Sequence, residues 1–168
     1  MKRKQPKTAP PRDPLEVALR FLALRARSAA EVRRALLRRG VPSAAVEETL
    51  ATLARQGYLD DAAFATAYAQ NRGVARRRGP RRVAADLGHL GVSREVAESA
   101  VRGAFNPGEE RRLAEAAAAR KWPTLARHPR PVALRRLAAH LSRQGFGPEV
   151  IAALLRDRFP TVESPELY

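Results

Sequence analysis

The stretch that decides the fold is Tyr58 to Val92, YLDDAAFATAYAQNRGVARRRGPRRVAADLGHLGV. Two aspartates start an aromatic-bearing helix, and a second helix begins at Gly79-Pro80 and closes at Gly91. Six arginines occur within eleven residues of this stretch, with no acidic residue among them: Arg72, Arg76, Arg77, Arg78, Arg81 and Arg82. We call these six residues the arginine cluster.

The helical pattern of this stretch occurs three times along the chain. A leucine lies four residues before each of three glycines, in the pairs Leu36 and Gly40, Leu87 and Gly91, and Leu141 and Gly145. The spacing between these glycines is 51 residues (91 − 40) and then 54 residues (145 − 91). Residues able to start a helix follow each glycine, at Ser43, Ser93 and Gly147. Such a period predicts three copies of one three-helix unit.

We expect an all-α fold, because no segment alternates apolar and polar residues for long enough to form a strand. Repeats that contact mainly their neighbours form an elongated tandem array. The expected three-helix repeats are residues 14–59, 60–106 and 107–160. A disordered basic arm at 1–13 and a C-terminal tail at 161–168 are expected to flank them.

Short polar residues precede the expected helices, where their side chains accept backbone N–H groups. These cap positions are Ser28, with Glu31 completing a capping box, Ser43, Asp60 or Asp61, Ser93, and Asn106, with Glu109 reaching back. The first helix of the third repeat is expected to end at Pro123, with residues 124–130 as a connector.

The composition predicts an anionic partner. The chain has 32 Lys and Arg residues against 17 Asp and Glu residues, a formal net charge of +15. Such a field attracts polyanions or acidic protein surfaces. The chain has no cysteine, which excludes disulfides, thiol nucleophiles and thiolate metal sites and favours a cytoplasmic location. No apolar run approaches the ~18 residues that would span a membrane.

Catalytic motifs are absent from the sequence, so we expect neither an enzyme nor a cofactor. The three histidines, His89, His128 and His140, have no metal-ligand spacing. Asp60 and Asp61 could be read as paired carboxylates, but helix capping explains them more simply. The aromatic residues recur at comparable places in the repeats, which favours packing over base stacking: Phe64, Tyr68, Phe105, Trp122, Phe146 and Phe159.

The arginine cluster has two interpretations. It could be a solvated face of an arginine-rich protein, since repulsion between exposed like charges costs only tenths of a kcal/mol per pair. Alternatively, arginines on both sides of a helix that starts at Gly79-Pro80 would form an anion-receiving site. We interpret the cluster as a surface that binds a partner or nucleic acid.

These residues resemble the RecX family of recombinase regulators. The resemblance is carried by Gly57-Tyr58-Leu59-Asp60-Asp61, Phe64-Ala65, Tyr68, Arg72, Gly79-Pro80-Arg81-Arg82-Val83-Ala84-Ala85-Asp86-Leu87 and Gly91-Val92. Ser28, Glu31-Val32 and Leu36 to Gly40 extend it to the first repeat, and it covers about residues 15–159. Asp86 departs from the family pattern, in which glutamate is more usual, and Gly88-His89-Leu90 replaces commonly basic residues.

The resemblance implies a binding regulator rather than an enzyme. An array of three-helix units would lie in the groove of a RecA filament on DNA, where it would damp strand exchange, ATP hydrolysis and coprotease action. The implied partners are the RecA filament and, weakly and non-specifically, single- and double-stranded DNA. We expect a monomer with no membrane association.

Two other functions remain open from the sequence. Three short helices with a glycine turn are typical of a helix-turn-helix transcription factor, although no dimer element is evident. A nuclease or another enzyme is the third possibility, and it has no evident metal site or nucleophile.

Overall fold

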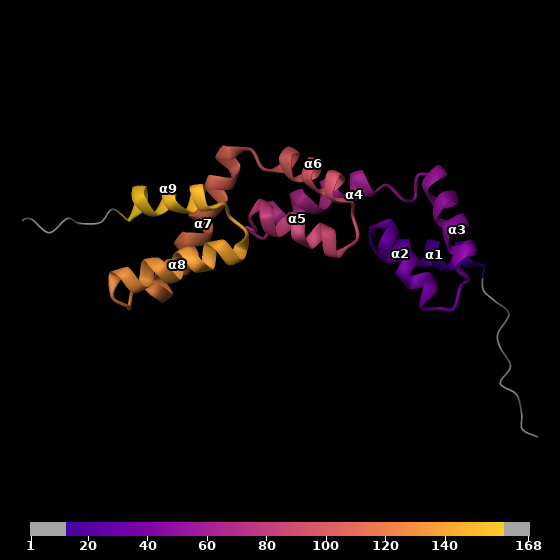
Figure 1. The fold of residues 1–168 in the computed structure, drawn as a ribbon, viewed down its shortest axis with the longest axis horizontal. Coiled ribbons are helices and arrows are strands. Elements are labelled where there is room, and N and C mark those ends of the chain that lie inside the picture. The colour runs from indigo at the N-terminus through magenta and orange to yellow at the C-terminus, as the bar shows by residue number, and fades with distance from the viewer. Residues whose placement is uncertain (1–12, 160–168) are drawn as a thin grey trace, which may run out of the picture. The chain divides into compact units, whose positions relative to one another are not determined.

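The structure is a computed structural model that describes residues 13–159, apart from the side chains of Arg72, Val74 and Pro107. Within these residues the chain is helical and contains no strand (Figure 1), so the all-α prediction is confirmed. Residues 1–12 of the expected arm and the expected tail lie outside the described residues. No helix in residues 13–159 is long and apolar enough to cross a membrane.

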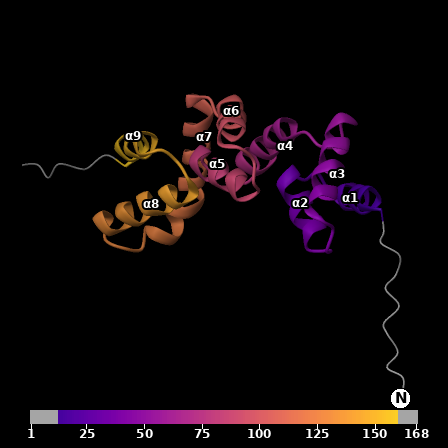
Figure 2. The same ribbon diagram turned by 45° about the vertical axis from the view of Figure 1, so that its right-hand side comes forward.

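The described chain forms two compact units. The first unit comprises residues up to 64 together with 90–92, and it contains α1 (Pro14–Leu24), α2 (Ala29–Leu37), α3 (Ser43–Arg55) and the start of α4 (Asp61–Tyr68). The second unit contains the end of α4, a π-helical turn (Ala69–Val74), α5 (Pro80–His89), α6 (Arg94–Ala104), α7 (Pro107–Leu125), α8 (Arg130–Gln144) and α9 (Pro148–Arg158). In the second unit, α7, α8 and α9 pack against one another (Figure 2).

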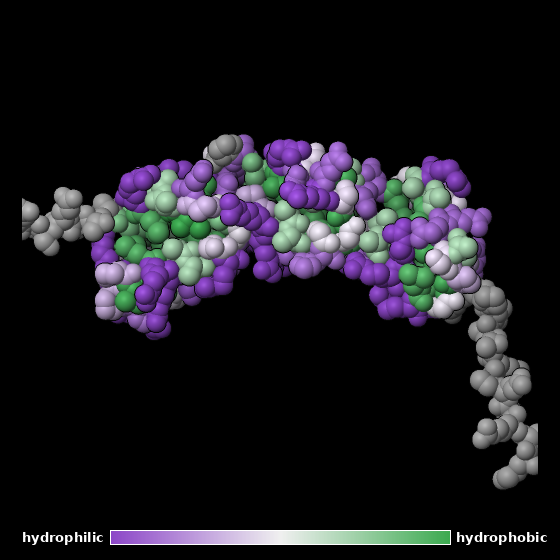
Figure 3. Space-filling model, in the orientation of Figure 1, coloured by the Kyte–Doolittle hydropathy of each residue, from purple (hydrophilic) through white to green (hydrophobic). Residues whose placement is uncertain are grey.

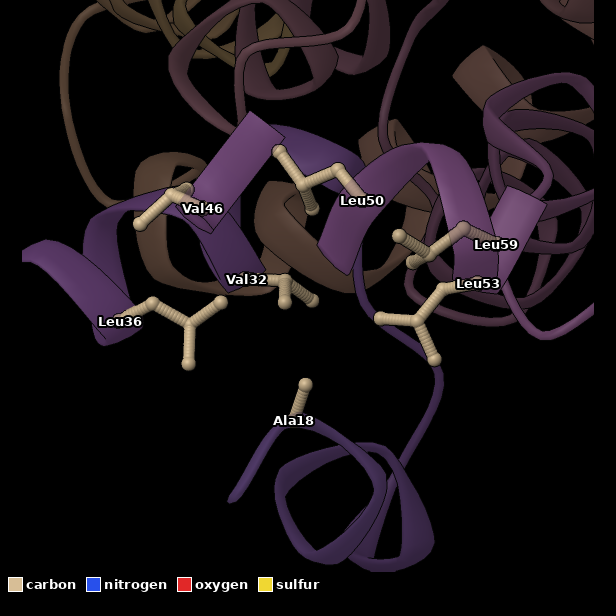
Figure 4. Close-up of a cluster of buried hydrophobic side chains, with 7 residues drawn as sticks. All are labelled: Ala18, Val32, Leu36, Val46, Leu50, Leu53 and Leu59. Carbon is tan, nitrogen blue, oxygen red and sulfur yellow. The ribbon is translucent and has the colours of Figure 1, made fainter. Parts of the chain in front are cut away.

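Buried aliphatic side chains hold the helices of the first unit together. The cluster consists of Ala18, Val32, Leu36, Val46, Leu50, Leu53 and Leu59 (Figure 4). Residues three or four apart on one helix share a face, which places the members from α2 and α3 in one core. Each fully buried leucine or valine contributes roughly 1.5–3 kcal/mol relative to an exposed one. Hydrophilic residues cover much of the face drawn in Figure 3.

Polar side chains start several helices where the sequence predicts them. The Ser28 hydroxyl accepts the Glu31 N–H at 3.2 Å, and the Glu31 carboxylate accepts the Ser28 N–H at 3.2 Å. This capping box is confirmed. The side chains of Asp60, Ser93 and Asn106 also accept N–H groups from the first turns of their helices, as predicted.

Three local predictions are wrong. α3 begins at Ser43, but Pro42 occupies the cap position and no side chain caps the helix. Glu109 does not complete a capping box, because its two carboxylate oxygens accept hydrogen bonds from Arg112 at 2.9 and 2.6 Å. α7 continues past Pro123, since a proline in the last turn removes only one N–H from the helix. In addition, Asp13, assigned to the basic arm, caps α1 through the Leu15 N–H at 3.0 Å.

The amino end of α2 closely approaches the turn that follows α5. The Ser28 hydroxyl donates to the Leu90 carbonyl at 2.6 Å. Gly91 has a φ of 86°, and a Cβ added to it would lie 2.3 Å from the Cβ of Ala30. Gly40 has a similar φ of 79°, but apart from its own and its neighbours' atoms no heavy atom of the described chain lies within 4 Å of the corresponding position.

Replacing Gly91 with alanine is expected to destabilise the first unit more than replacing Gly40 with alanine. Both changes place a side chain in the left-handed region, at a cost of roughly 1–2 kcal/mol. The Gly91→Ala change also forces a contact with Ala30, which adds about 1–3 kcal/mol. Urea unfolding followed by circular dichroism measures the loss in free energy of unfolding for both variants. Equal losses would show that the close approach of Gly91 to Ala30 does not contribute to stability.

Candidate functional site

The arginine cluster lies in the second unit, around the turn between the π-helical turn and α5. Arg72 belongs to the π-helical turn, and its side chain is outside the described part of the structure. Arg76, Arg77 and Arg78 precede α5, whereas Arg81 and Arg82 lie in its first turn. π-Helical turns within α-helical segments are frequent at functional sites.

One carboxylate pairs with two members of the cluster. Asp86 accepts hydrogen bonds from the Arg78 guanidinium and from the Arg82 Nε at 3.1 Å. The Tyr68 hydroxyl lies 3.5 Å from the same carboxylate. The Asp86 side chain is only 14% exposed, so these charge-assisted contacts are partly shielded from water. Arg78 and Arg82 are therefore held in place within the unit.

The side chains of Arg76, Arg77 and Arg81 are exposed, and none of them forms an ion pair with the described residues. Arg77 has a φ of 53°, in the left-handed region that a residue with a side chain enters at a cost of roughly 1–2 kcal/mol. Backbone strain of this kind clusters at functional sites. Among the cluster members whose side chains are described, these three have no carboxylate partner, and we call them the available arginines.

Two of these available arginines line a hollow of about 300 Å³ together with residues of α7 and α8. Its lining residues are Arg76, Arg77, Ala117, Arg120, Lys121, Thr124, His140 and Gln144. No carboxylate belongs to this lining in the described part of the chain. We call this hollow the basic pocket.

Helical spacing places the residues of α7 and α8 in the basic pocket. Four residues at intervals of three, one and three form a single face of α7: Ala117, Arg120, Lys121 and Thr124. His140 and Gln144 are one turn apart on α8. Burial lowers the pKa of His140, and so do the positive charges of Lys121, Arg143 and Arg120. The three nearby cations that contribute to this shift make the potential beside the pocket positive.

The amino end of α5 is occupied by the carbonyl end of α8. The Gly79 N–H donates to the Gln144 carbonyl at 2.8 Å, and the Arg81 N–H donates to the Gly145 carbonyl at 3.1 Å. A Cβ on Gly79 would lie 2.3 Å from the Gly145 carbonyl carbon. The prediction of an anion site at the α5 amino end is therefore wrong, because these N–H groups already have acceptors.

The paired aspartates serve the backbone rather than a metal. Asp60 accepts the N–H groups of Ala62 and Ala63, both at 2.9 Å, and Asp61 accepts the Ala29 N–H at 2.8 Å. Their predicted capping role is confirmed for Asp60, whereas Asp61 binds the first turn of another helix. Within residues 13–159, no group of three or more His, Asp or Glu residues is placed to hold a metal ion.

Aromatic side chains pack within the helical units, as predicted. Phe64, Phe105 and Phe146 are buried, and the rings of Trp122 and Phe159 lie 4.3 Å apart. A second hollow, of about 600 Å³, lies beside this ring pair and is lined largely by alanine, leucine and aromatic side chains. No aromatic residue belongs to the described lining of the basic pocket, so Arg76 and Arg77 have no platform there on which a base could stack.

Three titratable residues of the basic pocket were not predicted as site residues from the sequence, namely Arg120, Lys121 and His140. The Arg120-Lys121 pair directly follows a run of four alanines, and this change from apolar to basic residues is the only local signal in the sequence. No sequence signal connects this pair to Arg76 and Arg77, because more than forty residues separate them.

Comparisons with known proteins agree on one family. Models of the first, second and third three-helix domains of RecX match residues 15–53, 60–101 and 109–155. A regulatory protein RecX from Geobacillus thermodenitrificans is 38% identical over 152 residues, which are 89% of this chain and 55% of that protein. Another from Thermobifida fusca is 31% identical over 141 residues, 84% of this chain and 76% of that protein.

A solved structure shows the same fold. The crystal structure of RecX from Lactobacillus salivarius matches with a TM-score of 0.78 at 17% identity, covering 86% of this chain and 93% of that chain. The chain spans about half the length of the Geobacillus relatives, 55% in each case.

Replacing Asp86 with asparagine is expected to destabilise the second unit and to strengthen DNA binding. The change removes the charge from the contacts to Arg78, worth roughly 1.5–3 kcal/mol, and to the more exposed Arg82, worth a few tenths of a kcal/mol, and it leaves both guanidinium groups without a carboxylate partner. Thermal unfolding measures the first effect. Fluorescence anisotropy with a labelled single-stranded oligonucleotide measures the second over a range of salt concentrations.

Glu98→Gln is the matched control, because it adds the same net charge to the same unit. Glu98 pairs with Arg94 at 2.7 Å, and the Arg94 side chain is 91% exposed. Exposed pairs contribute little to stability. The role of Asp86 is contradicted if both variants lose equal stability and gain equal DNA affinity.

Proposed function

This chain belongs to the RecX family, and we propose that it regulates recombination by binding the filament that RecA recombinase forms on DNA. In this proposal it damps strand exchange, ATP hydrolysis and the coprotease action of the filament, without catalysis of its own. The matched relatives from Geobacillus thermodenitrificans and Thermobifida fusca are named regulatory protein RecX. The observation that carries the proposal is the set of available cations in the second unit.

The proposed contact face is the arginine cluster, within which the members have different roles. Arg76, Arg77 and Arg81 are exposed and make direct contacts with phosphates or carboxylates of the filament. Arg78 and Arg82 hold the turn in place through Asp86. Arg72 completes the proposed face. An arginine fork binds either anion in bidentate fashion, which suits a filament that presents both DNA and protein.

The three-helix repeats at 14–59, 60–106 and 107–160 are the proposed functional divisions of the chain. Their partners in this proposal are the recombinase filament and DNA of either strandedness, bound weakly and without sequence preference. The protein acts as a monomer in the cytoplasm. The net charge of +15 supports association with a polyanionic filament, and it makes the rate of association dependent on salt.

Sequence-specific transcription control has less support. A helix-turn-helix protein reads base edges with its second, recognition helix, which α6 would be in the middle repeat. The available arginines of the cluster lie before α5 or in its first turn, not on α6. Arg94, at the start of α6, is paired with Glu98.

The recombinase ATPase on single-stranded DNA is expected to fall when small amounts of the protein are added. The charge reversals Arg76→Glu and Arg77→Glu, made together, should raise the half-inhibitory concentration at least about tenfold, which corresponds to about 1.4 kcal/mol of lost binding. A titration of the ATPase rate with each protein measures this change.

The matched control carries Arg127→Glu and Arg135→Glu, two exposed arginines outside the arginine cluster and the basic pocket. This variant has the same net charge as the test variant, and it should inhibit nearly as well as the unchanged protein. Equal loss in both variants would assign the effect to overall charge. An unchanged ATPase and unchanged strand exchange with the unaltered protein would refute the proposed function.

A further inference from the structure

We propose that the basic pocket is a binding site for phosphate groups, presented either by a free oligophosphate or by a nucleic-acid backbone. The site combines arginines of the middle repeat with an arginine and a lysine of the third repeat, all within the second unit. It goes beyond the proposed regulation, because it is a property of the protein alone and requires no recombinase.

Three separate elements position the basic side chains around the pocket. The turn that carries Arg76 and Arg77 is joined to the end of α8 by the hydrogen bond from Gly79 to Gln144. Arg120 lies on α7, which packs against α8. The charges therefore converge through the tertiary fold rather than through a flexible run of arginines, and a ligand meets a largely preformed site.

The lining of the basic pocket combines several cations with no carboxylate among the described residues. Some arginines elsewhere in the unit pair with carboxylates, as in the Arg111–Asp157 pair at 2.7 Å and the Arg112–Glu109 pair at 2.6 Å. The basic pocket gathers its cations without a carboxylate among its described lining residues. A bound anion would offset the mutual repulsion of these cations, which supplies part of the binding free energy.

The chemistry and size of the pocket fit phosphate. Two or more guanidinium forks can each donate paired hydrogen bonds to phosphate oxygens, while Lys121 adds a compact positive charge. A volume of about 300 Å³ lies at the lower end of small-ligand pockets, which span roughly 300–1,000 Å³. This size fits one or a few phosphate groups better than a whole nucleotide.

The larger hollow beside Trp122 lacks these properties. The arginines on its edge are engaged, since Arg112 pairs with Glu109 at 2.6 Å and Arg158 lies 3.4 Å from Glu115. Its remaining lining is mostly apolar. The phosphate site is therefore assigned to the smaller, basic pocket.

Isothermal titration of the isolated full chain with tripolyphosphate tests the site. The test variant carries Arg77→Asn and Arg120→Gln, and asparagine is chosen because it tolerates the left-handed backbone at position 77. We expect its affinity to fall at least about tenfold, since charge-assisted hydrogen bonds are lost. A control with Arg102→Gln and Arg135→Gln has the same net charge and should lose less than about threefold.

The pKa of His140 provides a second readout at the pocket itself. Bound phosphate would counter the nearby charges of Arg120, Lys121 and Arg143, and it would add its own favourable interaction with the imidazolium. We expect the pKa of His140, followed by NMR, to rise on saturation with tripolyphosphate. His89 and His128 do not line the pocket and serve as internal references.

Competition with a short oligothymidylate identifies the source of the phosphate. Displacement of tripolyphosphate assigns the site to a nucleic-acid backbone, and no displacement assigns it to a free oligophosphate; both results support the site. The proposal is overturned by absence of tripolyphosphate binding, by equal weakening in both double variants, or by an unchanged His140 pKa at saturation. Because no recombinase is present, these results are independent of the ATPase titration.

Discussion

The contact between the amino end of α5 and the carbonyl end of α8 organises the second unit. Two backbone hydrogen bonds join these ends, from Gly79 to Gln144 at 2.8 Å and from Arg81 to Gly145 at 3.1 Å. The positive end of one helix dipole thus meets the negative end of another. Only glycine fits at this approach, because a Cβ on Gly79 would overlap the Gly145 backbone. The contact fixes the turn that carries the available arginines.

Next to this contact between α5 and α8, the arginines of the cluster lie in different environments. Arg78 and Arg82 share the partly buried carboxylate of Asp86. Arg76 and Arg77 instead line a pocket with basic residues of α7, and Arg81 is exposed at the start of α5. Arginines that look alike in the sequence therefore differ in the structure: some pair with a carboxylate of the protein, and others have no such partner among the described residues. Only the available charges can contribute strongly to binding a partner.

Local rules explain most of what the sequence predicts correctly. Ser28 and Asp60 start helices because a short polar side chain can accept a nearby N–H, and this depends on a few adjacent residues. The buried positions of α2 and α3 follow from helical spacing in the same way. The failure at Pro123 is also local, since the missing N–H falls where the last turn of α7 tolerates it.

The basic pocket and the occupied end of α5 were not predictable by such rules. Arg77 and Arg120 line the same pocket only because α7, α8 and the turn before α5 pack together. No short-range sequence pattern encodes that packing. The sequence suggested free N–H groups at the start of α5, yet acceptors more than sixty residues away satisfy them. The sequence therefore identified some of the candidate site residues, but only the tertiary structure shows which of them lie together.

Hydrogen–deuterium exchange of the protein, alone and saturated with recombinase filament on single-stranded DNA, tests the central claim most directly. That claim is that the arginine cluster, carried by the turn before α5 and by the first turn of α5, is the contact surface for the filament. We predict that exchange slows in peptides covering 75–83 when the filament is bound. Unchanged exchange in these peptides, with protection confined to α1, α2 and α3, would contradict the account.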